Sequence, residues 1–461
     1  MLRNERGPHL GGTTCVVLGF ARSGRAAASL LVEAGAKVRC VDAASAEKLS
    51  VAPEDVPGGT SWLGREDPAV LEGTDFVIAS PGIPPRNPVL AAALARGIPV
   101  RSELELGWWF TDAPVVAITG TNGKTTTTEL VGAMGRAAGR DTLVAGNVGT
   151  PLSGCARKRP DLIVLEVSSF QLYLCHDFRP HVAAVLNLTS DHLDWHPDFE
   201  DYARAKGKLF AKQGPQDAAV LNGADPEVVE RYSNVAAEVF LFRESPPPAK
   251  GSFLRDGRVV IQLDGEAEPL LPLSEWPLAG RHNRENLMAA ALCARLIGLP
   301  GEAIRSAART FRALPHRMEV VGVVGGVTWI NDSKSTNPGS LEKALDPDVS
   351  TILIAGGLTK GVDFRPIREE VARGARLVLL IGQGAADIEK AWSPAVRMMH
   401  CEDLSTAVQV AASEARSGER VLLSPACASF DQFQNYVHRG NRFRELVHEL
   451  SAGRSDERGS E

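Results

Sequence analysis

Short runs of apolar residues alternate along the chain with longer segments of helical pattern. Residues 76–79, 115–118 and 377–381 are examples of such runs, and their length and aliphatic composition favour buried strands. Many of the runs end in a turn rich in glycine, proline or small polar residues, after which a helical pattern begins. The alternation predicts an α/β fold of mostly parallel strands, with ligand-binding loops at their carboxyl ends.

The stretch 114–128 carries the clearest chemical pattern. The strand 115–118 leads into the loop Gly120-Thr121-Asn122-Gly123, and a helix begins at Lys124 and Thr125. Loop amides and the helix N-terminus favour phosphate, Lys124 adds a cation, and the Thr125 hydroxyl is a ligand for Mg²⁺. Ile118 stands where the usual phosphate loop has its first glycine, so a helix that merely begins with Gly-Lys-Thr is the alternative. The strand–loop–helix context favours a nucleoside triphosphate site.

Residues 13–42 predict a strand, a glycine turn, an alanine-rich helix and a second strand that ends in Asp42. This unit is similar to a dinucleotide-binding βαβ unit, in which the terminal acid accepts from a ribose hydroxyl. Ala21 lies between Gly19 and Gly24, at the position where a second glycine would let pyrophosphate approach. An NAD site, a site for another nucleotide and glycines that serve only packing all remain open.

Polar residues follow several other predicted strands. The loop Ser80-Pro81-Gly82 follows residues 76–79, and the turn with Asn147 follows the phosphate-loop helix. Glu166 lies near the end of the strand 161–167, where Mg²⁺-dependent nucleotide chemistry places a carboxylate. His192 lies among acidic residues after the strand 182–188, where it would be a metal ligand if a metal–phosphate site is near. The alternative for Glu166 is a glutamate that is merely exposed at the surface, and the alternative for His192 is likewise a surface histidine.

The remaining candidates lie in the second half of the chain. Asn283 and Asn286 precede an alanine-rich helix at 287–297, where they would be donors to a ligand or helix caps. Arg317 lies in an apparent linker that precedes a third α/β unit. The turns after the strands of this unit should share one edge of its sheet, because they follow the carboxyl ends of parallel strands.

Composition narrows the class of protein. The 461 residues are 44% hydrophobic and 23% charged, as in an ordinary globular protein of two to four domains, and the net charge of −6 argues against nucleic acid as a partner. No apolar run is long enough for a membrane helix, and the N-terminus has no export signal. Seven cysteines without metal-type pairs fit a reducing cytosol.

Taken together, the motifs resemble those of the amino acid ligases of peptidoglycan precursor synthesis. The short phosphate loop is this family's form, which accounts for Ile118. The two C-terminal motifs are similar to those of the branch that adds D-glutamate. The matching motifs, in chain order, are Ser80-Pro81-Gly82, residues 119–126, Gly146-Asn147, Asp191-His192, His282-Asn283 with Asn286, residues 331–337 and residues 424–433.

The resemblance implies an α/β protein of three domains. A Rossmann-like domain at 1–102 would hold the UDP end of the substrate, a central P-loop ATPase-type domain at 103–312 would bind ATP, and a Rossmann-like domain at 313–461 would admit the amino acid. It also implies a reaction, in which the carboxylate of UDP-N-acetylmuramoyl-L-alanine attacks ATP and the amine of D-glutamate captures the acyl phosphate. A cytoplasmic and monomeric enzyme is expected.

The resemblance also implies roles for particular residues. Lys206 would be a carbamylated lysine, because its CO₂ adduct is a carboxylate ligand whereas an ammonium repels Mg²⁺. Two Mg²⁺ ions would be held by Thr125, Glu166, His192 and Lys206, and catalysis would also use Lys124. The ATP-binding set is Gly120, Thr121, Asn122, Gly123, Lys124, Thr125, Thr126, Thr127, Asn283, Asn286, Arg317 and Asp332. The substrate-binding set is Gly19, Phe20, Ala21, Asp42, Ser80, Gly82, Asn147, Lys334, Thr336, Lys360, Ser429, Phe430 and Tyr436. Phe430 stands where the family commonly has an aliphatic residue, and Tyr436 where it commonly has phenylalanine.

Three other functions compete with this interpretation. A Rossmann oxidoreductase would use residues 19–42 but leaves Lys124, Thr125 and Glu166 without a role. A GTPase-like switch would use the phosphate loop, but the sequence has no N-K-x-D motif to recognise guanine. A folate-glutamating ligase or a sibling muramoyl ligase is the nearest competitor within the family.

Overall fold

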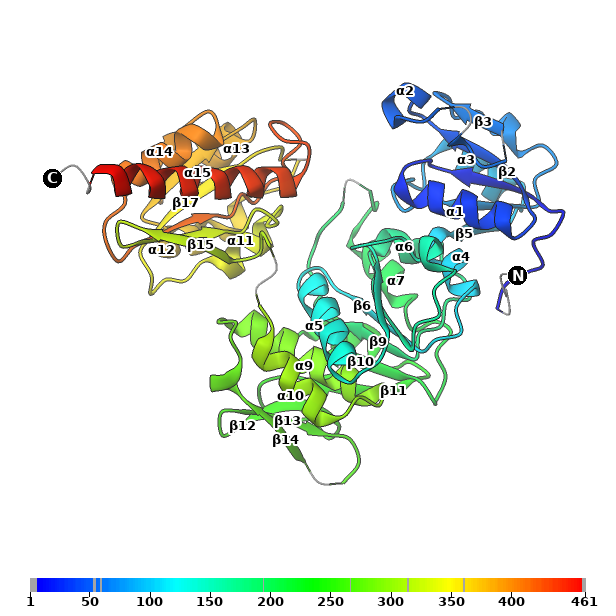
Figure 1. The fold of residues 1–461 in the computed structure, drawn as a ribbon, viewed down its shortest axis with the longest axis horizontal. Coiled ribbons are helices and arrows are strands. Elements are labelled where there is room, and N and C mark those ends of the chain that lie inside the picture. The colour runs from blue at the N-terminus through cyan, green and yellow to red at the C-terminus, as the bar shows by residue number, and fades with distance from the viewer. Residues whose placement is uncertain are drawn as a thin grey trace. The chain divides into compact units, whose positions relative to one another are not determined.

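The structure is a computed structural model that describes residues 6–52, 55–58, 60–193, 195–265, 267–312, 315–359 and 361–457. Lys360, predicted to bind substrate, lies outside the described residues. The chain divides into two compact units, Met1–Phe311 and Arg312–Glu461. It contains three α/β sheets, of which the first two belong to the first unit (Figure 1). The predicted fold class is confirmed.

The first sheet has five parallel strands in the order β3-β2-β1-β4-β5. This is the order of the first five strands of a Rossmann fold, and it contains the strand–helix–strand unit that the pattern at residues 13–42 predicts. Its strands are β1 (Thr14–Leu18), β2 (Lys37–Asp42), β3 (Thr60–Leu63), β4 (Phe76–Ala79) and β5 (Val100–Ser102). Its helices are α1 (Arg22–Glu33), α2 (Ala46–Leu49) and α3 (Pro88–Ala95), and α4 (Glu103–Trp109) follows β5.

The second sheet has nine strands in the order β14-β13-β12-β11-β10-β9-β6-β8-β7. The strands from β7 to β12 are parallel, whereas β13 and β14 extend the edge in antiparallel pairs that the sequence pattern does not predict. The strands are β6 (Val115–Thr119), β7 (Thr142–Gly146), β8 (Leu162–Glu166), β9 (Val182–Val185), β10 (Ala218–Asn222), β11 (Glu238–Phe242), β12 (Gly251–Arg255), β13 (Arg258–Gln262) and β14 (Glu268–Pro272). Strands β6, β8, β9 and β10 are buried at every position, as expected of a parallel sheet covered on both faces.

Helices surround this sheet, and α5 packs against both α9 and α10 (Figure 1). The helices are α5 (Lys124–Ala137), α6 (Ser169–Tyr173), α7 (Phe199–Gly207), α8 (Pro226–Tyr232), α9 (Arg281–Leu296) and α10 (Gly301–Thr310). Helix α9 begins at Arg281, six residues before the predicted start at residue 287. Strand β9 ends at Val185, three residues before the predicted end at 188. The first difference moves predicted site residues, because Asn283 and Asn286 fall inside a helix. The second lengthens the loop that carries His192, which begins at residue 186.

The third sheet forms the second unit, with the strand order β15-β16-β20-β17-β18-β19. Strands β16, β20, β17 and β18 are parallel, so their carboxyl ends share one edge as predicted, and β15 adds an antiparallel edge. The strands are β15 (Glu319–Val324), β16 (Val327–Asn331), β17 (Thr351–Gly356), β18 (Leu377–Ile381), β19 (Arg397–His400) and β20 (Arg420–Leu423). The helices are α11 (Pro338–Ala344), α12 (Arg368–Gly374), α13 (Ala385–Trp392), α14 (Leu404–Glu414) and α15 (Tyr436–Glu457).

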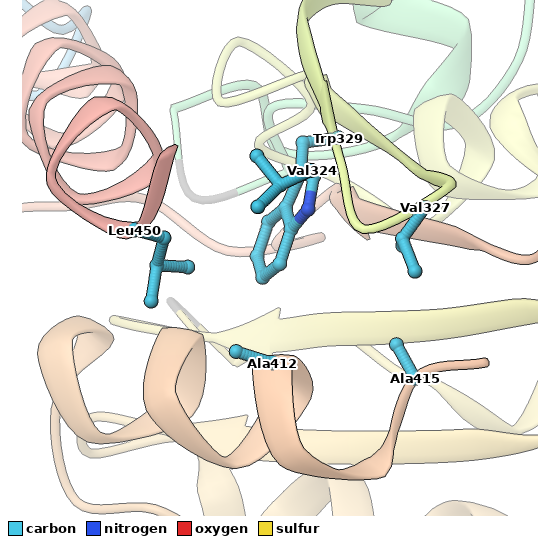
Figure 2. Close-up of a pocket in the computed structure, with 6 residues that line it drawn as sticks. All are labelled: Val324, Val327, Trp329, Ala412, Ala415 and Leu450. Carbon is cyan, nitrogen blue, oxygen red and sulfur yellow. The ribbon is translucent and has the colours of Figure 1, made fainter. Parts of the chain in front are cut away.

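A small apolar cavity lies between the β15–β16 hairpin and helices α14 and α15 (Figure 2). Trp329 is its largest lining side chain, and Val324, Val327, Ala412, Ala415 and Leu450 complete the lining. These residues belong to or border the core of the third sheet. The cavity therefore reflects packing within that core.

The cysteines are free and buried, as expected for small core residues. Burial raises the pKa of the Cys40 thiol to about 12. Among the residues that the structure describes, no helix has the length and apolar composition needed to cross a membrane.

Candidate functional site

The predicted phosphate loop connects β6 to α5 in the second sheet. Gly123 has a left-handed backbone with a φ of 83°, and a Cβ atom there would lie 2.4 Å from Oδ1 of Asn286. Glycine is therefore needed at this position, both because the backbone is left-handed and because there is no space for a side chain. Helix α5 begins at Lys124 without a side-chain cap. Its N-terminus thus has the geometry of an anion site.

Asn187, which follows β9, holds the loop from the neighbouring strand. Its Oδ1 accepts a hydrogen bond from the Asn122 amide at 2.8 Å, and its Nδ2 donates to the Asn122 carbonyl at 3.1 Å. The Thr121 amide donates to the Asn187 carbonyl at 3.0 Å. Asn187 is not among the predicted site residues, although a polar residue at the end of a buried strand is a usable signal of a site.

Two lysines converge on the loop. The Lys124 amine donates to the carbonyl oxygens of Gly120 and Thr121, at 2.9 and 2.8 Å. Lys206, on α7, is only 1% exposed, and its amine donates to the Gly120 carbonyl at 3.0 Å and to the Thr119 hydroxyl at 3.3 Å. Burial lowers the pKa of Lys206 well below its ordinary value, and the nearby Lys124 lowers it further.

Glu166 is the last residue of β8 and is buried. Its Oε1 accepts a hydrogen bond from the Asn147 side chain at 2.8 Å. Its Oε2 is also buried and has no hydrogen-bond partner within the described part of the chain. A buried carboxylate oxygen without a donor is costly unless a cation approaches it. Glu166 therefore fits the predicted role of metal ligand better than that of a surface glutamate.

His192 lies in the loop after β9 and has a left-handed backbone with a φ of 56°. Its side chain is 43% exposed, its Nε2 lies 3.7 Å from Oδ2 of Asp191, and its ring packs edge-on against Phe170 at 4.7 Å. Within the ranges that the structure describes, no three His, Cys, Asp or Glu side chains gather as a ready metal cluster. Mg²⁺ commonly takes one or two protein carboxylates and completes its shell with phosphate and water, so the single buried carboxylate of Glu166 fits such a site.

Asn283 and Asn286 lie in the first turns of α9, not before it. Asn286 accepts a hydrogen bond from the Thr127 hydroxyl at 3.3 Å, which ties α9 to α5 beside the loop. The Asn283 side chain donates to the Ala279 carbonyl at 2.7 Å. Neither side chain caps α9, whose N-cap residue is Gly280 without a side-chain cap. The helix-capping alternative is therefore wrong.

The predicted residues of the first sheet gather where β1, β2 and β4 end. The Ser80 hydroxyl donates to the Gly19 carbonyl at 2.8 Å, and the Phe20 amide donates to Asp42 Oδ2 at 2.6 Å. Ala21 is the N-cap residue of α1, and Gly82 lies in the loop after β4. A Cβ atom on Gly24 would lie 1.8 Å from the Gly19 carbonyl oxygen. Gly24 therefore allows close packing of α1 against the Gly19 turn, which agrees with the alternative that these glycines serve packing.

Most of the predicted residues of the third sheet lie in the loops after β16 and β20, whereas Arg317 precedes β15 and Tyr436 begins α15. Burial raises the pKa of Asp332 to about 7, against the opposing effect of a hydrogen bond from the Ser424 hydroxyl and of the Arg317 charge. The Lys334 amine donates to the Tyr436 hydroxyl at 3.2 Å and lies 4.7 Å from its ring centre.

Three further predicted residues of this unit differ in exposure. Ser429 is buried, whereas Thr336 and Phe430 are exposed. The predicted ATP-binding set is thus divided between the two compact units, with Arg317 and Asp332 in the second.

Family models match three parts of the chain. The N-terminal domain of MurD-like Mur ligases matches residues 13–102, the Mur ligase middle domain matches 118–294, and the glutamate ligase domain of Mur ligases matches 316–427. Each matched range falls on one of the three sheets.

Curated relatives match nearly the whole chain. The UDP-N-acetylmuramoylalanine–D-glutamate ligase of Anaeromyxobacter dehalogenans is 43% identical, with 96% of this chain and 99% of that protein covered. The enzyme of the same name from Pelotomaculum thermopropionicum is 41% identical, with 95% and 98% covered. Among solved structures, the MurF ligase from Thermotoga maritima in complex with ADP matches with a TM-score of 0.61 at 15% identity, with 98% of each chain covered.

Proposed function

This chain belongs to the Mur ligase family, and we propose that it is the member that uses ATP to add D-glutamate to UDP-N-acetylmuramoyl-L-alanine. The observation that carries the proposal is identity of about 40% over 95% of the chain to relatives named for this reaction. Such a product is a precursor of peptidoglycan. The phosphate loop, with Lys124 and the buried Glu166 beside it, supports a reaction at the γ-phosphate of ATP.

In the proposed mechanism the substrate carboxylate attacks the γ-phosphorus and releases ADP, which leaves an acyl phosphate. The amine of D-glutamate then attacks the acyl carbon, phosphate leaves, and the amine loses a proton as the amide forms. The first step brings two anions together, which costs several kcal/mol in a poorly hydrated cleft. We infer that Lys124 and the loop amides offset this repulsion, so that positioning and charge neutralisation supply most of the rate enhancement.

Mg²⁺ would supply further positive charge to the phosphates when it is bound. Thr125 and Glu166 are the proposed ligands of one ion, and His192 with a carbamylated Lys206 those of a second. The unpartnered Oε2 of Glu166 supports the first assignment, because it lacks a donor in a buried position. The lowered pKa of Lys206 supports carbamylation, because the neutral amine is the form that adds CO₂.

We propose that the three sheets correspond to three domains with separate ligands. Residues 1–102 would hold the UDP end of the substrate through the loops with Gly19, Phe20, Ala21, Asp42, Ser80 and Gly82. Residues 103–312 would bind ATP, with Asn147 near the substrate carboxylate. Residues 313–461 would bind D-glutamate through Lys334, Thr336, Lys360, Ser429, Phe430 and Tyr436, and would contact ATP through Arg317 and Asp332.

The cellular setting follows from the proposed substrates. ATP and a UDP-linked sugar are cytoplasmic metabolites, so we propose a cytoplasmic enzyme. A single chain carries every residue that the mechanism uses, so a monomer suffices for activity.

Product analysis tests the proposal against its nearest competitors. The chain, with ATP, Mg²⁺ and UDP-N-acetylmuramoyl-L-alanine, should convert D-glutamate to a product heavier by one glutamyl residue and release ADP. L-alanine with UDP-N-acetylmuramate, and L-glutamate with a folate, serve as the competing substrate pairs. Turnover of either competing pair in preference to D-glutamate would overturn the proposal.

A further inference from the structure

A buried chain of three side chains lies beside the proposed metal ligands and has no role in the mechanism above. His196 Nδ1 lies 2.7 Å from Oδ2 of Asp201, and His196 Nε2 lies 2.9 Å from the Ser169 hydroxyl. Ser169, His196 and Asp201 are 1%, 1% and 3% exposed. A serine so enclosed does not reach a substrate, so the arrangement is not that of a nucleophile.

The chemistry of the groups sets the direction of the hydrogen bonds. The Asp201 carboxylate only accepts, so His196 Nδ1 carries the hydrogen. In the neutral ring Nε2 is then the acceptor for the Ser169 hydroxyl. Arg204 donates to the other oxygen of Asp201 and keeps that carboxylate paired. Both ring nitrogens of His196 are therefore satisfied in a fully buried position, which gives the ring one preferred orientation.

His196 joins the three segments that carry the proposed metal ligands. Ser169 begins α6, three residues after Glu166. Asp201 lies on α7, the helix that carries Lys206. The backbone amide of His196 donates to the carbonyl of His192 at 2.9 Å. One imidazole and its own backbone thus contact the segments of Glu166, His192 and Lys206.

Aromatic packing strengthens this connection. The Phe170 ring stacks on the His196 ring, with 5.7 Å between centres and 19° between planes. The same Phe170 ring also makes the edge contact with His192. The left-handed backbone of His192 is strained for a residue with a Cβ atom, so surrounding contacts must hold it.

We propose that His196 is a positioning residue that sets the mutual placement of Glu166, His192 and Lys206. This inference rests on the proposed function, because it assigns those three residues to the metal–phosphate site. Removal of a group that hydrogen-bonds directly to a metal ligand typically weakens metal affinity or activity about 10- to 100-fold, and His196 acts one step further out, through the His192 backbone and the helices next to Glu166 and Lys206. His196 acts through its neighbours and does not itself touch the substrate.

Mn²⁺ binding in the presence of ADP, followed by electron paramagnetic resonance, tests the proposal without turnover. His196→Ala should weaken Mn²⁺ binding about 10-fold or more. Ser169→Ala should have a smaller effect in the same direction. His196→Asn should recover part of the loss, because its side-chain amide can still donate to Asp201.

Tyr232→Phe is the matched control. The Tyr232 hydroxyl donates to the Ala203 carbonyl of α7 at 2.6 Å, so this variant loses one buried hydrogen bond on the same helix without touching His196. It should bind Mn²⁺ as the unmodified chain does, even if its melting temperature falls. In steady-state assays His196→Ala should lower kcat and raise the Mg²⁺ concentration for half-maximal rate, whereas Tyr232→Phe should leave both unchanged.

Equal Mn²⁺ affinities of His196→Ala and Tyr232→Phe would overturn the proposal. If His196→Ala does not fold, Ser169→Ala and His196→Asn are judged by the same comparison. The outcome is separable from that of the proposed function. A chain that fails to transfer D-glutamate would contradict the function, whereas the Mn²⁺ comparison would still decide whether His196 positions the site.

Discussion

The amine of Lys206 lies 3.0 Å from the carbonyl oxygen of Gly120, so a fully enclosed lysine reaches into the phosphate loop from α7. The proximity of a second lysine, Lys124, adds to the effect of burial and lowers the pKa of Lys206. A bare ammonium at this position would compete with a metal ion. Carbamylation removes that conflict, because it replaces the positive charge with a carboxylate.

We therefore expect Lys206 to carry a carbamate in the active enzyme. Native mass spectrometry should show an added mass of one CO₂, and removal of CO₂ at low pH should abolish both the adduct and most of the activity. Bicarbonate should restore activity to the unmodified chain but not to Lys206→Ala. An intact mass that does not change on CO₂ removal would contradict this expectation.

Lys124→Ala should abolish turnover, because the phosphates lose the cation that the loop holds beside them. A decrease of about 10²-fold or more in kcat is expected from the loss of one such electrostatic contact. Lys212→Ala, which removes an exposed lysine paired with Asp177, serves as the control. Activity of Lys124→Ala within tenfold of the unmodified chain would mean that the phosphate site is misplaced.

Asp332 should make the second unit less stable as the pH rises. Its pKa is about 7 in the folded chain and near 4 in the unfolded chain, so between these values the folded state binds more protons and stability falls with rising pH. The cost at pH 8 is on the order of 2–4 kcal/mol relative to pH 4. Asp332→Asn keeps an acceptor for the Met318 amide and should remove this dependence.

Hydrogen exchange of the slowest amides of β16 and β20 measures this effect. The variant and the unmodified chain are compared at the same pH, which cancels the intrinsic change in exchange rate. The protection gained by Asp332→Asn should grow from pH 5 to pH 8. A gain that stays constant over this range would show that Asp332 is ionised throughout.

Ser429→Ala should mainly raise the KM for D-glutamate and leave the KM for ATP unchanged. Ser429 is buried in the loop after β20, in the unit proposed to bind the amino acid. Ser413→Ala, at an exposed helical serine of the same unit, is the control. An equal rise in the KM values for D-glutamate and for ATP would contradict the proposal that residues 313–461 bind D-glutamate.

The sequence was sufficient for features that depend on neighbours along the chain. The strand β6, the glycine loop and the start of α5 at Lys124 follow from a short apolar run, small residues and a helix former in succession. The shared edge of the third sheet follows from parallel strands that end in polar turns. Position 123 also requires glycine because a Cβ atom there would clash with Asn286, and this contact is visible only in the folded structure.

Features that depend on distant contacts were not predictable in this way. Asn187 holds the phosphate loop from the end of the neighbouring strand β9, and its polar character there is a signal only that a site is near, not of what it contacts. His196 joins α6 to α7, and nothing in its local pattern indicates this. The sequence pattern predicts a later start of α9, because asparagine is typical of helix caps, whereas the side chains of Asn283 and Asn286 form hydrogen bonds with Ala279 and Thr127. The Asp42 carboxylate accepts hydrogen bonds from the backbone amides of Phe20 and Ala44, and the strand pattern indicates neither of them.

Transfer of oxygen from substrate to phosphate tests the central claim most directly, namely that ATP activates a substrate carboxylate for capture by D-glutamate. UDP-N-acetylmuramoyl-L-alanine labelled with ¹⁸O in its carboxylate is incubated with ATP, Mg²⁺ and D-glutamate, and the released phosphate is analysed by mass spectrometry. The account predicts one ¹⁸O atom in each phosphate released, with release dependent on both the labelled substrate and D-glutamate. Unlabelled phosphate released at the same rate without D-glutamate would show that water attacks ATP, and would contradict the account.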